Sequence, residues 1–441
     1  MASFQNFLHK TTYDDLPNEV TAFGRRCLLD LVGVLISGSE TKLSRLISQH
    51  AHEHFGGGFK SASILLKNLN ASPAGAALAN AMTLDSIDAH DGFKPAKGHV
   101  GCHVLPTIIA FGEAENMLDG KEFLTSLVIG YEIGGRAAVA LHGSVPDYHT
   151  SGAWGAVTSA ALGSRILKLD KDRTRHAIGI GEYHGPRSQM MRCIDYPTML
   201  KDGSGWGAMA GISATYLARD GFTGAPAITI EGDDVAHYWK DLGNCWTILE
   251  QYFKAYPVCR WAQPATEAAL ALTKANNIKP EDIKFIEAHT FLEGCKLATR
   301  EPADTEQAQY SLPFPVAASL VFGKLGPEEI SQKNLENTEV LRLSNSMKLI
   351  ENKDYNAVFP EQRYAHVVIE LNSGERLTSE RHTARGDPEN HLTMQEIHDK
   401  FYAFASPVVG EKRTSEIEGI IMQMGEGKNL NDLLDVLIHP A

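Results

Sequence analysis

The sequence predicts a mainly α-helical protein in which a smaller α+β domain is inserted before the last helices. Three observations lead to this prediction. Before residue 260, segments rich in Ala and Gly repeat apolar residues at helical spacing. Between residues 261 and 389, two segments alternate apolar and polar residues, as half-buried strands do. Helical spacing then returns near the C-terminus. We therefore expect a helical domain of residues 1–260, completed by 390–441, and an α+β lid domain of residues 261–389.

The helical domain is expected to begin at Pro17-Asn18-Glu19, which is a helix start signal. Apolar residues between Val20 and Leu35 then share one face of the first long helix. Small residues recur in five further helical segments, so these helices can approach one another closely. The five segments are 74–87, 105–114, 123–141, 153–167 and 205–217.

The lid domain is expected to contain strands at 283–292 and 364–371, with helices at 315–325 and 338–351 between them. The turn signal at 372–375 predicts a hairpin that returns through 376–381. Helical segments at 393–404, 414–424 and 429–438 would pack back on the first domain. A cleft between the two domains is then the default ligand site.

Composition excludes several classes of protein. With 43% apolar and 22% charged residues among 441, the chain is typical of a globular protein. A net charge of -13 and the absence of long Lys and Arg runs argue against a nucleic-acid partner. Six scattered cysteines without a CxxC pair fit a reducing compartment and no disulfides. No signal peptide or membrane-spanning run is recognised, so we expect a cytoplasmic protein without a membrane partner.

A polar segment from Asp88 to His103 separates two of the helical patterns. It carries two carboxylates, three imidazoles and two ammonium groups, which is typical of a loop that performs chemistry. A metal site formed by its histidines and carboxylates is the main alternative within the loop. No HExxH, His-x-His or CxxC spacing supports that alternative, and no glycine-rich phosphate loop is present. We therefore expect neither a metal nor an organic cofactor.

Several short motifs, taken in order, resemble the MmgE/PrpD family over nearly the whole chain. Members include 2-methylcitrate dehydratases, cis-aconitate decarboxylases and iminodisuccinate epimerases. The resemblance implies a homodimer, a helical domain with an α+β lid domain, and catalysis without a cofactor. The motifs are Ser86-Ile87-Asp88 through Leu105-Pro106, Tyr148-His149-Thr150, Lys201-Asp202-Gly203, Lys254-Ala255-Tyr256-Pro257-Val258-Cys259-Arg260 and Gly386-Asp387-Pro388.

The resemblance also assigns roles and shows three departures. The family's loop Asp and His fall on Asp88 and His99, and its second-loop His falls on His149. Lys201 stands where an imidazole is usual. In the decarboxylase branch a His and a Tyr are usual where this chain has Cys259 and Phe314.

The activities of the family share one demand, the handling of a proton on a carbon next to a carboxylate. Asp88 is the first candidate for the general base or for the group that orients it, and His99 and His149 are candidates for proton transfer. Lys201, at the start of a predicted helix, would stabilise the charge that develops on the carboxylate. The alternatives are a solvated carboxylate at Asp88 and a surface pair of Lys201 with Asp202.

Substrate binding is expected at the junction between the domains. Lys254 and Arg260 flank Tyr256-Pro257, which would present two cations to a carboxylate. Arg192 would hold a second carboxylate or pair with Asp195 instead. Lys97 and Tyr256 complete the predicted binding set. The remaining histidines are expected to be structural or to line the cleft, among them His90, His103, His142 and His184.

These residues together predict a cofactor-independent homodimeric enzyme that acts on a small di- or tricarboxylate. A hydro-lyase resembling 2-methylcitrate dehydratase is favoured, with an epimerase resembling iminodisuccinate epimerase second. A cis-aconitate-type decarboxylase comes third because of Cys259 and Phe314. Outside enzymes, the alternative is a polycarboxylate-binding protein.

Overall fold

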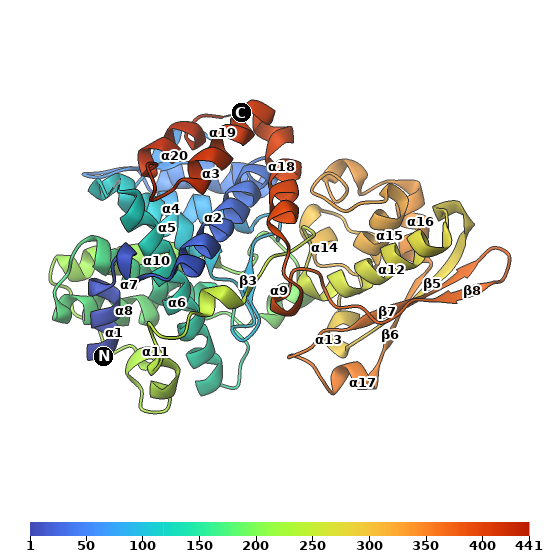
Figure 1. Ribbon diagram of the computed structural model, residues 1–441, viewed down its shortest axis with the longest axis horizontal. Coiled ribbons are helices and arrows are strands. Elements are labelled where there is room, and N and C mark those ends of the chain that lie inside the picture. Colours follow the sequence, from blue (N-terminus) through green and yellow to red (C-terminus); the bar gives the residue numbers. More distant parts are fainter. Residues whose placement is uncertain (118, 441) are drawn as a thin grey trace.

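Figure 1 shows the computed structural model, which describes residues 1–117 and 119–440. Helices gathered on one side form what we call the helical body, residues 1–260 and 390–441. A four-stranded sheet and its helices lie on the other side and form the sheet region, residues 261–389. The protein is mainly α-helical, as its sequence predicts.

The helical body contains the five small-residue helices and the long first helix that the spacing predicts. Small residues let the helices approach closely, because a Cβ on Gly211 would lie 2.5 Å from the carbonyl oxygen of Ala156 on a neighbouring helix. The predicted helices are α2 Asn18–Gly38, α4 Pro73–Asp85, α5 Gly101–Glu115, α6 Gly120–Ser144, α7 Gly152–Ile166 and α10 Ser204–Arg219. Helices not predicted are α1 Ala2–Lys10, α3 Lys42–His54, α8 Lys171–His184, α9 Met191–Asp195 and α11 Ile228–Glu231, and a small hairpin joins β1 Ala62–Ile64 to β2 Leu69–Ala71.

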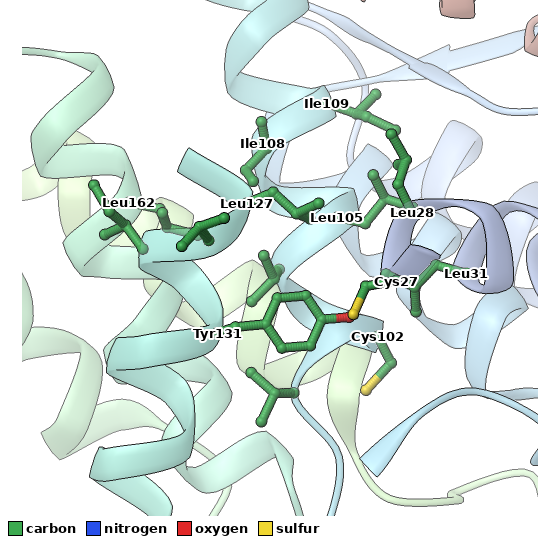
Figure 2. Packing of buried hydrophobic residues seen from close by; sticks show 14 of the residues in the cluster. Cys27, Leu28, Leu31, Cys102, Leu105, Ile108, Ile109, Leu127, Tyr131 and Leu162 are labelled. Atoms are coloured by element: carbon green, nitrogen blue, oxygen red, sulfur yellow. The ribbon is translucent and has the colours of Figure 1, made fainter. Parts of the chain in front are cut away.

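The core of the helical body surrounds Tyr131 of α6. Figure 2 shows its ring among leucine and isoleucine side chains, with its hydroxyl beside the sulfur of Cys27. That hydroxyl donates a hydrogen bond to the carboxylate of Asp91 in the polar loop. Burial raises the pKa of Asp91 to about 7. The polar loop is thus anchored in the core from one side.

Among the described residues, α6 is the one helix long and apolar enough to cross a membrane. Its apolar window is 94% buried inside the protein, as in a core helix. No apolar run of membrane-spanning length was recognised in the sequence, so this segment was not singled out there.

The sheet region has the strand order β6-β5-β7-β8. Strand β5 Ile283–Thr290 pairs in parallel with β6 Met347–Glu351 and antiparallel with β7 Ala365–Leu371. The predicted hairpin is confirmed, since β7 turns at 372–375 into β8 Arg376–Thr378. Its helices are α12 Gln263–Asn276, α13 Leu292–Cys295, α14 Thr305–Gln309, α15 Pro313–Phe322, α16 Thr338–Asn345 and α17 Lys353–Asn356.

One predicted element of the sheet region is wrong. The segment 338–351 was expected to be a single helix, but α16 ends at Asn345 and β6 begins at Met347. The backbone groups of its last five residues, Met347–Glu351, pair with those of β5 instead. A short apolar run is compatible with the periodicity of a helix and with that of a strand. Pairing with the distant strand β5 therefore decides which of the two forms.

The C-terminal helices are α18 Met394–Val409, α19 Glu411–Met422 and α20 Leu430–Leu437. Helix α18 packs on α2, where a Cβ on Gly33 would lie 2.9 Å from the Phe401 ring. Lys400 Nζ lies 2.5 Å from Asp30 Oδ1 of α2 and donates to the carbonyl of Ala89 at 2.8 Å. The end of the chain therefore holds the start of the polar loop.

Strand β3 Gly92–Phe93 of the polar loop pairs antiparallel with β4 Gln251–Tyr252, which precedes the sheet region. A Cβ on Gly92 would lie 2.3 Å from the Tyr252 hydroxyl oxygen, so only glycine allows this approach. The pairing brings the chain around Lys254 alongside the residues that follow α4.

Candidate active site

The centre of the site is a buried ion pair between Asp88 and Lys254. Helix α4 ends at Asp85, and Asp88 then adopts a left-handed backbone with φ of 49°. Lys254 Nζ donates to Asp88 Oδ1 at 2.6 Å and to the Asp88 carbonyl at 2.8 Å. Only 2% of Asp88 and 1% of Lys254 is exposed. Lys254, predicted as a substrate clamp, thus orients the predicted base.

His99 lies beside this pair with one ring nitrogen free. Its Nδ1 is 2.5 Å from the Asp91 carbonyl oxygen, which can only accept, so Nδ1 carries the hydrogen. Burial, with the charges of His90 and Lys254, holds the pKa of His99 well below 6.5. The neutral imidazole therefore has its lone pair on Nε2, as a general base requires.

His90 lies behind His99, with ring centroids 4.2 Å apart. Its Nε2 is 3.0 Å from Asp85 Oδ1. Burial alone would lower the pKa of His90, but the hydrogen bond and the charge of Asp85 outweigh burial and raise it. His90 was expected to be structural or to line the cleft, and the structure places it at the centre of the site.

Asp88, His90 and His99 each offer one ligand atom, and these atoms lie within 4.8 Å of one another. Three such ligands are the donor set of many metal sites. Here, however, the ammonium of Lys254 lies against the Asp88 carboxylate, and Asp85 already holds His90 Nε2. A cation at the centre of this cluster would face an ammonium group, so the donor set does not fit a metal.

Lys201 forms a second group beside the first. Its backbone is left-handed with φ of 51°, and it lies just before α10. Its ammonium donates to Gln309 Oε1 and lies 5.0 Å from the centroid of the Tyr310 ring. Lys201 is buried and forms no ion pair with any residue that the structure describes. The alternative of a surface pair with Asp202 therefore does not hold.

Two buried carboxylates, Asp85 and Asp202, lie beside these groups. Asp85 Oδ2 accepts from the backbone N–H of Asp202 at 3.2 Å and from Ser204 Oγ at 3.1 Å. Burial would raise the pKa of Asp85, but His90 and Lys201 lower it. Burial and the charge of Asp85 raise the pKa of Asp202 to about 7. Near neutral pH Asp85 is therefore the more fully ionised of the two carboxyls.

His149 and Lys97 lie in a third group. His149 Nδ1 is 3.0 Å from the Asp147 carbonyl oxygen, and its backbone N–H donates to His142 Nε2 at 3.1 Å. Lys97 Nζ lies 6.0 Å from the centroid of the Tyr148 ring. This group meets the first through Trp154, whose Nε1 donates to the His99 carbonyl at 3.1 Å.

Two of the predicted binding residues have contacts outside the central pair, and a third is exposed. The guanidinium of Arg260 is buried and donates to Asp387 and, at 2.9 Å, to the Arg385 carbonyl, so it ties the two ends of the sheet region together. Burial and then Glu267 raise the pKa of Tyr256. Arg192 on α9 is exposed and has no ion pair with Asp195.

Sequence reasoning missed Arg363, which precedes β7. Its side chain is 7% exposed, and its Nε is buried without a hydrogen-bond partner among the described residues. Its charge lowers the pKa of Tyr148 and Tyr252, although their burial raises it more. Tyr148 and Tyr252 belong to the helical body, so Arg363 faces the site from the sheet region. No motif marks this arginine in the sequence.

Comparison with known families decides the relationship. The MmgE/PrpD N-terminal domain matches residues 2–237, and the MmgE/PrpD C-terminal domain matches residues 256–424. The chain belongs to the MmgE/PrpD family. The resemblance expected from the loop motifs is thus confirmed.

Three known proteins are similar to the chain over nearly its whole length. A cis-aconitate decarboxylase-like protein, oryM, of Aspergillus oryzae is 22% identical and covers 99% of this chain and 96% of its own. The cis-aconitate decarboxylase of Mus musculus is 23% identical, covering 100% and 93%. That of Homo sapiens is 24% identical, covering 98% and 92%.

Two departures from the decarboxylase branch of the MmgE/PrpD family lie in buried positions. Burial, with the charge of Asp88, raises the pKa of the Cys259 thiol to about 12. Phe314, at the start of α15, is fully buried and has no hydroxyl. Neither side chain can therefore exchange a proton readily at neutral pH.

Proposed function

We propose that this protein is a lyase that handles a proton on a carbon next to a carboxylate of a small di- or tricarboxylate. The observation that carries the proposal is a neutral imidazole, His99, beside the buried Asp88–Lys254 pair. Decarboxylation of a cis-aconitate-like tricarboxylate is the first reaction to test, because the relatives named above are cis-aconitate decarboxylases. This ranks decarboxylation above the hydro-lyase that the sequence favoured.

The cations of the site meet the chemical demand of such reactions. Removing a proton next to a carboxylate places a second negative charge on that carboxylate, and loss of CO₂ from an unsaturated acid passes its electron pair into the adjacent double bond. Lys201 has no carboxylate within ion-pair distance among the residues that the structure describes, and Gln309 holds its ammonium in place. A fixed, desolvated ammonium stabilises such charge far better than water does.

The base and its support have defined tasks in this proposal. In a dehydration His99 Nε2 accepts the substrate proton, while Nδ1–H stays bound to the Asp91 carbonyl. Decarboxylation takes no proton from the substrate and needs a proton donor instead. Asp88, oriented by Lys254, stabilises the imidazolium that forms. His90, which shares its proton with Asp85, supplies a proton donor beside His99.

A hydro-lyase is the second candidate, and two residues favour it. Decarboxylation needs a proton donor to the far carbon of the double bond, and neither Cys259 nor Phe314 supplies one at the two positions where the decarboxylase branch is expected to have a His and a Tyr. Dehydration instead needs a neutral base to take the proton and an acid for the departing hydroxyl, which His99 and His90 provide.

NMR in deuterated buffer separates these reactions. We expect cis-aconitate to lose CO₂ and to gain one deuteron from solvent. Conversion of 2-methylcitrate to an alkene, with no loss of CO₂ from cis-aconitate, would favour the hydro-lyase. Asp88→Asn should lose the reaction, while Asp195→Asn, an exposed carboxylate outside the site, should keep it. Binding of tricarboxylates without any labelling or turnover would contradict the proposal and indicate a binding protein.

A further inference from the structure

The buried cations around the site differ in whether they have a carboxylate partner. Lys254 pairs with Asp88, Arg260 with Asp387 and Lys400 with Asp30. Lys201 and Arg363 are as deeply buried, yet neither forms an ion pair with any residue among 1–117 and 119–440. A buried charge without a counter-ion is strongly unfavourable, so such a charge persists where an anion completes it.

The two unpaired cations come from opposite parts of the molecule. Lys201 precedes α10 in the helical body, whereas Arg363 precedes β7 in the sheet region. Lys201 rests on Gln309 and the Tyr310 ring. The charge of Arg363 acts on Tyr148, Tyr252 and Cys259. The charge of Arg363 also acts on His99, and that of Lys201 acts on Asp85, the partner of His90. Both cations therefore lie near the neighbouring rings of His90 and His99.

We propose that Arg363 binds a second carboxylate of the substrate while Lys201 binds the carboxylate next to the reacting carbon. This inference rests on the proposed function and assigns a residue to the second carboxylate of its substrate. A ligand with one carboxylate leaves one buried cation unpaired, whereas a dicarboxylate neutralises both. Arginine suits this task, because its planar guanidinium matches a carboxylate with two parallel hydrogen bonds.

Titration calorimetry with succinate and butyrate tests the assignment directly. Both probes have four carbons, and they differ by one carboxylate. We expect the natural protein to prefer succinate, and Arg363→Gln to weaken succinate binding about 10- to 100-fold, as loss of a hydrogen-bonded charge does. Butyrate binding should change less than about twofold. Arg363→Lys should restore part of the preference for succinate, because lysine keeps the positive charge but cannot form the two parallel hydrogen bonds of a guanidinium.

Arg381→Gln is the matched control. Arg381 is an exposed arginine of the same region. Its guanidinium lies over the ring of Tyr364, and Tyr364 directly follows Arg363 in the chain. It should bind both probes as the natural protein does. Equal succinate affinity in Arg363→Gln and Arg381→Gln would overturn the assignment, as would a natural protein that does not prefer succinate to butyrate.

A thermal melt without ligand shows whether the variants fold. Because Arg363 has no partner to lose, Arg363→Gln should melt at or above the temperature of the natural protein. Failure of the proposed function is separate from failure of this inference. Absence of turnover with every carboxylate, together with selective loss of succinate in Arg363→Gln, would refute the reaction and keep the binding role. Normal turnover with an unchanged KM for a dicarboxylate in Arg363→Gln would keep the proposed reaction and refute the binding role of Arg363.

Discussion

Three candidate residues of the site have left-handed backbones. Asp88, Lys97 and Lys201 have φ of 49°, 53° and 51°. This region disfavours side chains with a Cβ, and such strain costs about 1–3 kcal/mol for each residue. Lysine has no local hydrogen bond to offset the cost, unlike aspartate or asparagine. Leu66 and Lys168, which lie outside the site, share this backbone conformation, so it does not by itself mark a functional position.

The neutral state of His99 gives a prediction for pH dependence. Its lowered pKa means that the base stays unprotonated below pH 6.5 and is lost only in more acidic solution. We expect the acidic fall of kcat/KM to lie below pH 6.5, and His99→Gln to lower kcat by about a hundredfold or more. A fall centred at or above pH 6.5, or a His99→Gln protein with normal kcat, would contradict this role.

At this scale the sequence predicted part of the site. Motifs singled out Asp88, His99 and Lys201 as candidates, and the structure buries all three. His90 looked like an ordinary buried histidine, since its partner Asp85 lies inside the preceding helix and gives no signal. Arg363 follows no motif, and its significance comes only from burial without a partner. Local sequence records residue types, but it does not record which charges the fold leaves unpaired.

At the scale of elements, α18 controls the polar loop. Lys400→Met would leave Asp30 buried without a counter-ion, which costs about 3–5 kcal/mol. It would also remove the donor to the Ala89 carbonyl, next to Asp88. We therefore expect a large fall in Tm and lower kcat.

The double variant Asp30→Leu/Lys400→Met should regain much of the Tm, because no charge is then left unpaired. Lys412→Met, at an exposed position of α19, is the control and should melt normally. A Lys400→Met protein with the Tm of the control would show that the pair contributes nothing.

The start of α10 gives a second prediction. The raised pKa of Asp202 means that the folded protein holds a proton that the unfolded chain has lost, between about pH 4 and 7. By linkage, this carboxyl makes the protein less stable as pH rises through that window. Asp202→Asn should therefore raise Tm by a few degrees at pH 8 and by less at pH 5. Asp195→Asn should show no such trend, and an equal effect of Asp202→Asn at both pH values would refute the explanation.

The sequence predicted most elements but not how they meet. Helices α2, α4 to α7 and α10 follow from spacing and small residues. The two-residue pairing of β3 with β4 has no sequence signal, because each strand spans only a single period of alternation. It nevertheless places Lys254 against Asp88, which lie 166 residues apart.

At the scale of the whole molecule, α10 and the segment before it carry an apolar stripe on the surface. Tyr196, Leu200, Trp206 and Leu217 are exposed, and the last two share one face of α10. Several large apolar side chains exposed along one element are typical of contact surfaces. A second copy of the chain is the occupant that we expect, as the family resemblance implies.

Light scattering after size exclusion tests this expectation. The natural protein should have the mass of a dimer, and Leu200→Glu with Trp206→Glu should shift it to a monomer that keeps its helical circular dichroism. Phe59→Glu, at an exposed apolar position outside the stripe, should remain dimeric. A natural protein that is monomeric at micromolar concentration would refute the interface.

The contact of Lys400 with the Ala89 carbonyl spans 311 residues and has a consequence for biosynthesis. The polar loop leaves the ribosome well before the helix that holds it, because Lys400 follows Ala89 by 311 residues. A nascent chain therefore carries every loop motif long before it has a working site. A copy shortened by a protease before α18 would keep the motifs and lose the activity.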